Sequence, residues 1–198
     1  MTVAFAPAGS AAASPPHQAA SEASDETLIG RIAGGDQLAM RTLFARHRVA
    51  LYRWLLRLVR DEALAEDLLS DVFLDVWRQA ASFRGRASVS TWLLAIARHM
   101  AASARRRRND AELDEATVST VPDPADDPEV TRHKKNRAEA LRQSLLQLSP
   151  DHHEVIDLAY YHGKSVKEIA EIVSISEATV KTRMFYARRK LAELVERT

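Results

Sequence analysis

The sequence predicts an all-α protein of two small helical domains joined by a flexible acidic linker, with a helix-turn-helix in the C-terminal domain. Apolar residues recur at spacings of three and four, as at Leu51, Leu55 and Leu58, which is the pattern of an amphipathic helix. No stretch sustains the two-residue alternation that predicts a strand. Glycine is scarce, at six residues in 198, which argues against a loop-rich β protein.

Composition excludes several classes of protein. The 28 Lys and Arg residues nearly cancel the 27 Asp and Glu residues, so the net charge of +1 gives no information about partners. The chain has no cysteine, which excludes a disulfide scaffold, a thiolate metal site and cysteine catalysis. No apolar run approaches the roughly 20 residues of a membrane span, and the N-terminus lacks the pattern of a secretory signal. We therefore expect a soluble, cytoplasmic protein.

The distribution of charge and proline predicts the domain boundaries. Residues 1–26 are rich in Ala, Ser and Pro and contain no Lys or Arg, so we expect a disordered tail. Residues 27–108 and 137–198 carry the helical patterns and are predicted as the two domains. The linker, residues 109–136, has eight acids and three prolines before residue 132. These acids either keep the linker solvated or lie across the basic faces of the domains, and both interpretations stay open.

The N-terminal domain contains an apolar stripe followed by a break. The stripe consists of Leu64, Leu68, Val72 and Val76. The pattern stops between Phe83 and Ser90, where Gly85 and two serines predict a loop. We expect Ser90 to cap a helix that begins near Trp92.

The C-terminal domain shows clear helix start and stop signals. Ser149 followed by Pro150 predicts a helix start, because a capping hydroxyl and a first-turn proline are both favoured there, and Gly163 predicts the end of that helix. The stretch Ser165–Glu168 is a capping box that opens a short helix. Ser176 is expected to cap the last helix. The apolar stripe of that last helix is Val180, Met184, Ala187, Leu191 and Leu194.

The last two helices have the pattern of a helix-turn-helix. Ala170 supplies the small residue required where the helices cross closely, and Ser174 occupies the turn position where glycine is commonest. The residues expected to lock the helices together are Ile169, Val173, Ile175 and Val180. The second helix would expose side chains suited to phosphates and base edges in a major groove: Thr179, Lys181, Thr182, Arg183, Phe185, Tyr186 and Arg189. The alternative is that this basic helix is only a solvated face.

Three stretches carry a resemblance to a known family: Ala65–Trp77, Ser82–Arg98 and Glu177–Arg188. Together they resemble bacterial RNA polymerase sigma factors of the extracytoplasmic-function group, over about residues 27–108 and 136–197. The resemblance implies an alternative sigma factor, not an enzyme, that binds core RNA polymerase, recognises −10 and −35 promoter DNA and starts transcription of a specific regulon. It implies no cofactor. It also implies an anti-sigma factor as an inhibitory partner, which in some relatives binds zinc.

The resemblance also implies roles for individual residues. The residues expected to contact the polymerase are Asp67, Leu69, Asp71 and Phe73, with Leu68, Val72 and Val76 left as core. The residues expected to contact the −10 element are Phe83, Arg84, Arg86, Trp92, His99, Arg105 and Arg106. An aromatic side chain with flanking arginines suits capture of an unstacked base, and the arginine run suits phosphates. The −35 element would be read by the exposed residues of the last helix. His99 stands where many relatives have Asn. An imidazole and an amide offer different hydrogen-bond donors, so the base sequence preferred at the −10 element stays open.

Two other classes of function compete with this interpretation. The first is an enzyme or metal protein using His152–His153 and His162, but no carboxylate–histidine spacing of a catalytic type surrounds them. The adjacent Tyr160–Tyr161 pair is expected to pack between helices. The second is a helix-turn-helix repressor or activator that binds duplex DNA alone. Such a regulator has no need of the block at residues 65–98, which favours the sigma-factor interpretation.

Overall fold

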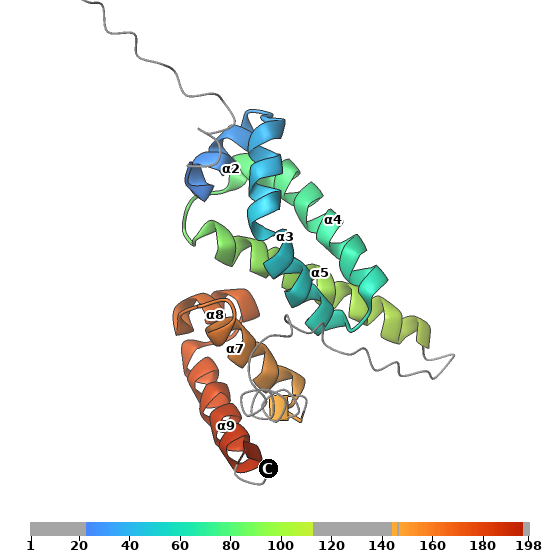
Figure 1. The fold of residues 1–198 in the computed structure, drawn as a ribbon, viewed down its shortest axis with the longest axis vertical. Helices are drawn as coiled ribbons and strands as arrows, with labels where there is room; N and C mark the ends of the chain where they lie inside the picture. Colours follow the sequence, from blue (N-terminus) through green and yellow to red (C-terminus); the bar gives the residue numbers. More distant parts are fainter. Residues whose placement is uncertain (1–22, 113–143, 146, 196–198) are drawn as a thin grey trace, which may run out of the picture.

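The computed structural model describes residues 23–112, 144–145 and 147–195, and within these ranges it contains helices and no strand (Figure 1). The N-terminal domain comprises α2 (Asp25–Ala33), α3 (Gln37–Val59), α4 (Glu62–Gln79), the short 3-10 helix η1 (Ala80–Ser82) and α5 (Val89–Glu112). The C-terminal domain comprises α7 (Pro150–Tyr160), α8 (Val166–Val173) and α9 (Glu177–Val195). The predicted all-α fold class is confirmed.

Short polar side chains start the N-terminal helices. The side chains of Ser24, Asp36 and Asp61 accept hydrogen bonds from backbone N–H groups in the first turns of α2, α3 and α4. Each of them satisfies donors that have no partner within the helix. Arg60 adopts a left-handed backbone conformation, with φ 55°, and turns the chain from the end of α3 directly toward α4. The tight turn makes α3 and α4 neighbours in the fold.

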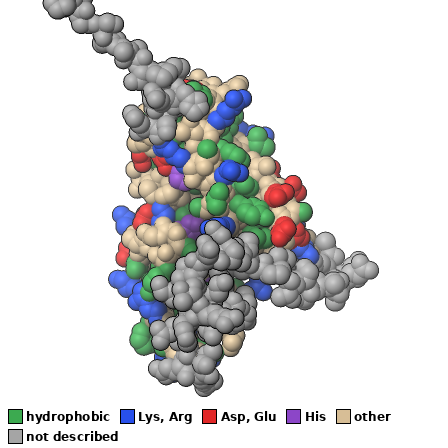
Figure 2. Space-filling view, viewed as in Figure 1, with side chains coloured by type: hydrophobic (Ala, Val, Ile, Leu, Met, Phe, Trp, Pro, Cys, Tyr) green, Lys and Arg blue, Asp and Glu red, His purple; other side chains and the backbone are tan. Residues whose placement is uncertain are grey.

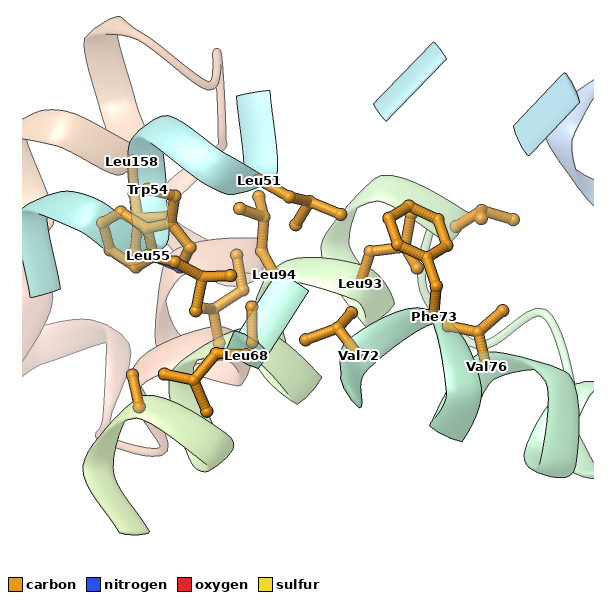
Figure 3. Close-up of a cluster of buried hydrophobic side chains, with 14 of the residues drawn as sticks. Leu51, Trp54, Leu55, Leu68, Val72, Phe73, Val76, Leu93, Leu94 and Leu158 are labelled. Atoms are coloured by element: carbon orange, nitrogen blue, oxygen red, sulfur yellow. The ribbon is translucent and has the colours of Figure 1, made fainter. Parts of the chain in front are cut away.

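The core of the N-terminal domain lies where α3, α4 and α5 meet (Figure 3). Trp54 of α3 and Leu93 of α5 are almost completely buried there. Of the predicted stripe on α4, Leu68, Val72 and Val76 are buried and Leu64 is half-buried. Burial of an apolar side chain of this size stabilises the fold by about 1.5–3 kcal/mol. This core fixes the position of the loop that connects η1 to α5.

The C-terminal domain packs against the N-terminal domain. Helix α8 lies against α5 (Figure 1). Leu158 of α7 is fully buried in the same cluster as Trp54 and Leu55 of α3 (Figure 3). The buried residues of α3, α4, α5, α7, α8 and α9 therefore belong largely to one continuous hydrophobic cluster.

The start of α5 differs from the prediction. The helix begins at Val89 rather than near Trp92, and Ser88 rather than Ser90 caps it. The hydroxyl of Ser88 accepts a hydrogen bond at 3.3 Å from the backbone N–H three residues further on. The hydroxyl of Ser90 instead accepts one from Lys164 Nζ of the C-terminal domain, at 2.6 Å. A contact between domains thus occupies the serine that the sequence pattern favoured as the cap.

The ends of other helices also differ from the predicted bounds. Helix α2 begins at Asp25, inside the predicted tail, and α5 continues to Glu112, inside the predicted linker. Helix α7 ends at Tyr160, and Gly163, with φ 60°, turns the chain toward α8. The predicted tail up to residue 22 and the predicted linker from residue 113 to 136 lie outside the described residues.

Candidate nucleic-acid interface

Helices α8 and α9 form the predicted helix-turn-helix. Ser165 and Glu168 make both reciprocal hydrogen bonds of the capping box that starts α8. Ser174 ends α8 in a left-handed backbone conformation, with φ 55°, so serine is accommodated where glycine is favoured. Ser176 caps α9 by accepting a hydrogen bond from the Thr179 N–H at 3.1 Å. Of the predicted lock, Ile169, Val173 and Val180 are buried and Ile175 is half-buried.

One face of α9 points into solvent, and we call it the α9 face. Its residues Thr179, Lys181, Thr182, Phe185, Tyr186 and Arg189 are exposed, and Arg183 is half-buried. The rings of Phe185 and Tyr186 meet edge to face with their centroids 5.5 Å apart. Arg183 pairs with Asp151 of α7, and Arg189 pairs with Glu193 at 3.1 Å. A phosphate or a base must therefore compete with a carboxylate for these two guanidinium groups.

The loop before α5 and the first turns of that helix enclose a hollow of about 380 Å³, which we call the loop hollow. The rings of Phe83 and Trp92 line it, with centroids 5.0 Å apart and planes inclined at 43°. Arg84 and Arg86 are exposed and line the same hollow. Gly85 between them adopts φ 65°, a conformation that a side chain would strain. Aromatic walls with two adjacent cations suit an unstacked base and its phosphates.

The other predicted −10 residues lie further along α5. His99, Arg105 and Arg106 are exposed. At 1.5 Å per helical residue, Arg105 is roughly 20 Å from Trp92 along the helix axis, so the structure does not bring the arginine run to the loop hollow. Arg106 donates a hydrogen bond to Ser103 Oγ at 3.2 Å. Arg105 and Arg106 lie toward the other end of α5, and His99 lies between them and the loop hollow.

The C-terminal domain contributes two carboxylates beside the loop hollow. Glu171 of α8 lines the hollow itself. Glu168 Oε1, one turn earlier, accepts hydrogen bonds from Thr91 Oγ1 at 2.6 Å and Ser88 Oγ at 3.2 Å. Burial alone would raise the pKa of Glu168, but hydrogen bonds from Thr91 and from the capping box outweigh it and lower the pKa to about 2. The carboxylate is therefore ionised at neutral pH.

Two ion pairs link α7 to the N-terminal domain. Arg57 Nε of α3 lies 3.0 Å from Asp157 Oδ2, and the Asp157 side chain is only 2% exposed. Arg98 Nε of α5 lies 2.7 Å from Glu154 Oε1. Charges removed from water in this way are stable only when they are paired. Together with the bonds of α8 to the start of α5, these pairs form what we call the closed contact.

His162 is buried at the edge of the closed contact. Its ring meets that of Trp54 edge to face, with centroids 5.5 Å apart, and its Nε2 lies 3.8 Å from Asp157 Oδ2. Burial, together with the positive charges of Arg57 and Lys164, lowers the pKa of His162 to about 4. The imidazole is therefore neutral at physiological pH.

On α4, the predicted polymerase-contact residues divide between surface and core. Asp67 and Asp71 are exposed and Leu69 is half-buried. Figure 2 shows acidic side chains gathered on the side of the molecule where α4 lies. Phe73 is in the core rather than on the surface, at 5% exposure, because its ring packs edge to face against Phe44 with centroids 4.8 Å apart.

Sequence reasoning missed two exposed apolar side chains of α4. Leu74 is 53% exposed and Trp77 is 38% exposed. Leu74 follows Asp71 by three residues and Asp67 by seven, so these three share one helix face. This spacing is visible in the sequence and could have placed Leu74 on the predicted polymerase-contact face.

Tyr160 and Tyr161 are exposed rather than packed between helices, which corrects the prediction. Each ring faces a guanidinium group: Arg188 lies 5.8 Å from the Tyr160 ring centroid, and Arg57 lies 5.1 Å from that of Tyr161. Cation–π contacts of this kind hold aromatic rings at a surface without burying them.

Two features are absent from the described residues. No three His, Asp or Glu side chains among them are grouped as metal ligands would be. None of the helices in the described part of the chain has both the length and the apolar character needed to cross a membrane.

Comparison with known proteins identifies the two domains. The family model of sigma-70 region 2 matches residues 43–111, and that of sigma-70 region 4 matches residues 138–191. The chain is 34% identical to RNA polymerase sigma factor CarQ of Myxococcus xanthus over 170 residues, covering 83% of this chain and 94% of that protein. It is 32% identical to ECF RNA polymerase sigma factor SigL of Mycobacterium tuberculosis over 164 residues, covering 82% of this chain and 92% of that protein.

A solved structure supports the same assignment. The fold is similar to that of the sigma factor RpoE in its complex with the anti-sigma factor NepR from Bartonella quintana. The TM-score is 0.67 and the identity 25%, over 79% of this chain and 96% of that one. The region 2 match also accounts for the block at residues 65–98 that a free-standing helix-turn-helix regulator does not require. The chain therefore belongs to the extracytoplasmic-function sigma factors, and it is an alternative sigma factor that directs promoter-specific transcription by RNA polymerase.

Proposed function

We propose that the loop hollow captures an unstacked base of the −10 element. The rings of Phe83 and Trp92 would stack on the base, and Arg84 and Arg86 would attract the adjoining phosphates. Stacking of a base on an aromatic side chain contributes about 1–3 kcal/mol. The observation that carries this proposal is the aromatic pair with two exposed cations around one hollow. His99, Arg105 and Arg106 would extend the contact along the DNA backbone.

We further propose that the α9 face reads the −35 element in the major groove. Lys181 and Thr182 are exposed near the start of the helix, where a recognition helix contacts base edges. Arg188 is exposed nearer the end of the helix, where we propose a phosphate contact, and its Nε donates a hydrogen bond to the Tyr160 hydroxyl at 3.2 Å. Arg183 would reach DNA by exchanging its Asp151 partner for a phosphate or a base.

For polymerase docking, we propose the face of α4 that carries Asp67, Asp71 and Leu74. An acidic and apolar surface of this kind fits a basic amphipathic element of the polymerase. Leu69 lies half-buried beside this face. Phe73 would contribute indirectly, by packing that holds the face in place.

The cellular setting follows from this function. A protein that acts on core polymerase and chromosomal promoters works in the cytoplasm. We propose that an anti-sigma factor holds it inactive, because the similar sigma factor RpoE was solved bound to one.

Run-off transcription with core polymerase on a promoter library tests the −10 proposal. The variant Arg84→Ala/Arg86→Ala should lose strand opening by about tenfold or more, because the loop hollow loses both cations. Permanganate footprinting measures the opening, and a pull-down checks that core binding is retained. The matched control Arg41→Ala/Arg48→Ala removes two exposed arginines of α3 and should transcribe normally. Equal loss in both variants would contradict the assignment.

A further inference from the structure

The closed contact buries a histidine of the C-terminal domain against the N-terminal domain. The His162 side chain is 7% exposed, and its ring packs edge to face on Trp54 of α3 with centroids 5.5 Å apart. Leu158 of α7 lies in the same cluster as Trp54 (Figure 3). Among the described residues, His162 Nε2 is buried without a hydrogen-bond partner. We propose that His162 is a proton-sensitive switch of the closed contact, whose protonation favours separation of the two domains.

The surroundings of His162 in the closed contact disfavour its charged form. Two cations lie near the ring: Arg57 of α3 and Lys164, which precedes α8. Glu168 of α8 partly neutralises Lys164, with 3.3 Å between Nζ and Oε1. Asp157 Oδ2 lies 3.8 Å from His162 Nε2, but the same oxygen accepts a hydrogen bond from Arg57 Nε at 3.0 Å. Burial and the two cations therefore lower the pKa of His162 to about 4.

Separation of the domains would reverse these effects. Arg57 leaves with the N-terminal domain, whereas Asp157 and His162 stay together, because the His162 backbone N–H bonds the Asp157 carbonyl oxygen at 3.3 Å. Asp157 then lacks its guanidinium partner, and an imidazole that has taken one proton from water supplies a positive charge in its place. The proton thus replaces Arg57 as the partner of the Asp157 carboxylate. The separated form binds the proton more tightly, so acid shifts the equilibrium toward it.

The expected response lies in mild acid. The pKa of His162 is about 4 in the closed contact, and a solvated imidazole has the ordinary value of 6.5. The ratio of separated to closed protein should therefore rise about tenfold between pH 7.5 and 5.5. The response is absent well above pH 6.5, grows as the pH falls and levels off below about 4. A proton is then an input to this sigma factor that requires no protein partner.

Fluorescence energy transfer within the full chain tests the proposal. The chain has no cysteine, so Ala45→Cys on α3 and Ala192→Cys on α9, both at exposed positions, provide two unique labelling sites. Arg98→Gln breaks the ion pair with Glu154 and raises the separated fraction at every pH, which brings the change into a measurable range. In this background, transfer should fall between pH 7.5 and 5.5 while far-ultraviolet circular dichroism stays constant.

Variants at three positions assign the response to its groups. His162→Phe keeps a ring against Trp54 but cannot take a proton, so transfer should stay constant over this range. His162→Gln should behave in the same way, which guards against overpacking by the larger ring. Asp157→Asn should show a smaller response, because the protonated imidazole loses its carboxylate. The matched control His152→Gln, on the side of α7 that faces α9, should keep the full response.

The outcomes of these measurements decide for or against the switch. Constant transfer at both pH values in the Arg98→Gln background would overturn it, as would an undiminished fall in both His162 variants. Loss of the helix signal in step with the transfer would also overturn it, because acid would then unfold the domains rather than separate them. None of these outcomes bears on the assignment of the loop hollow or of the α9 face to promoter DNA.

Discussion

The α9 face and the loop hollow, both proposed to bind DNA, differ in what lies against them. Six of the seven residues of the α9 face are exposed, and the apolar side of α9 packs against α7 and α8. The loop hollow has Glu171 of the other domain in its lining and Glu168 bonded to the helix beside it. The difference teaches that two surfaces of one chain with similar residue types can differ in access, because one faces solvent and the other is partly lined by the second domain.

The ion pairs near the two surfaces differ in which domain supplies the carboxylate. On the α9 face, Arg183 and Arg189 pair with carboxylates of their own domain. At the closed contact, Arg57 and Arg98 pair with carboxylates of the other domain. Separation of the domains would therefore change the electrostatics of the loop hollow and leave those of the α9 face largely as they are.

The largest effect is expected from the apolar centre of the closed contact. Leu158→Ala removes a fully buried leucine shared by both domains and should lower the free energy of unfolding by about 2–5 kcal/mol. Urea denaturation measures the loss. Leu191→Ala, at a half-buried position on α9, should cost clearly less. Equal losses would show that burial of Leu158 between the domains contributes no more stability than a half-buried leucine of α9.

The second-largest effect is expected from acid, which should lower the free energy of unfolding through His162 at the closed contact. The pKa of His162 is about 4 in the folded state, below the ordinary value of 6.5, so the unfolded chain binds the extra proton first as pH falls. The stability from the neutral imidazole is complete above pH 6.5 and is lost as the pH falls toward 4. Between pH 7.5 and 5 the free energy of unfolding should drop by about 1–2 kcal/mol through this residue.

Thermal unfolding across that pH range measures the effect. His162→Gln should remove this part of the pH dependence, whereas His99→Gln, at an exposed position on α5, should retain it. An unchanged pH profile in His162→Gln would show that the buried imidazole does not contribute.

A smaller effect is expected on the α9 face. Lys181→Ala should change promoter choice by about 1 kcal/mol, or roughly fivefold between promoters, because a base contact is lost. Arg188→Ala should weaken binding evenly across sequences, as loss of a phosphate contact does. Run-off transcription on several promoters separates the two patterns. Identical changes on every promoter would remove the distinction between the two residues.

The smallest effect is expected on α4, away from both DNA surfaces. Asp71→Asn should weaken binding to core polymerase by less than about 1 kcal/mol, because an exposed charge pair contributes little. Binding of labelled protein to core polymerase measures this, with Glu26→Gln on α2 as a control of equal charge. The weakening should shrink at high salt. A salt-independent loss would indicate a contact other than charge attraction.

The sequence by itself determined the helical fold class, the caps of the C-terminal helices and the helix-turn-helix, because these depend on residues only a few positions apart. The capping box at Ser165, the cap at Ser149 and the stripe on α4 were all readable from spacing. The candidate residues Phe83 and Trp92 could also be named, through the resemblance of this stretch to the part of sigma factors that reads the −10 element.

Only the tertiary structure decided what each face packs against. Ser88 caps α5 and Ser90 bonds Lys164, although the local sequence permitted the reverse. Phe73 is buried by Phe44, which lies on another helix, and Glu168 bonds Thr91 across 77 positions of the chain. Periodicity shows that a face is buried or polar, but the partner that covers it is fixed by packing between distant segments. The closed contact belongs wholly to that second class.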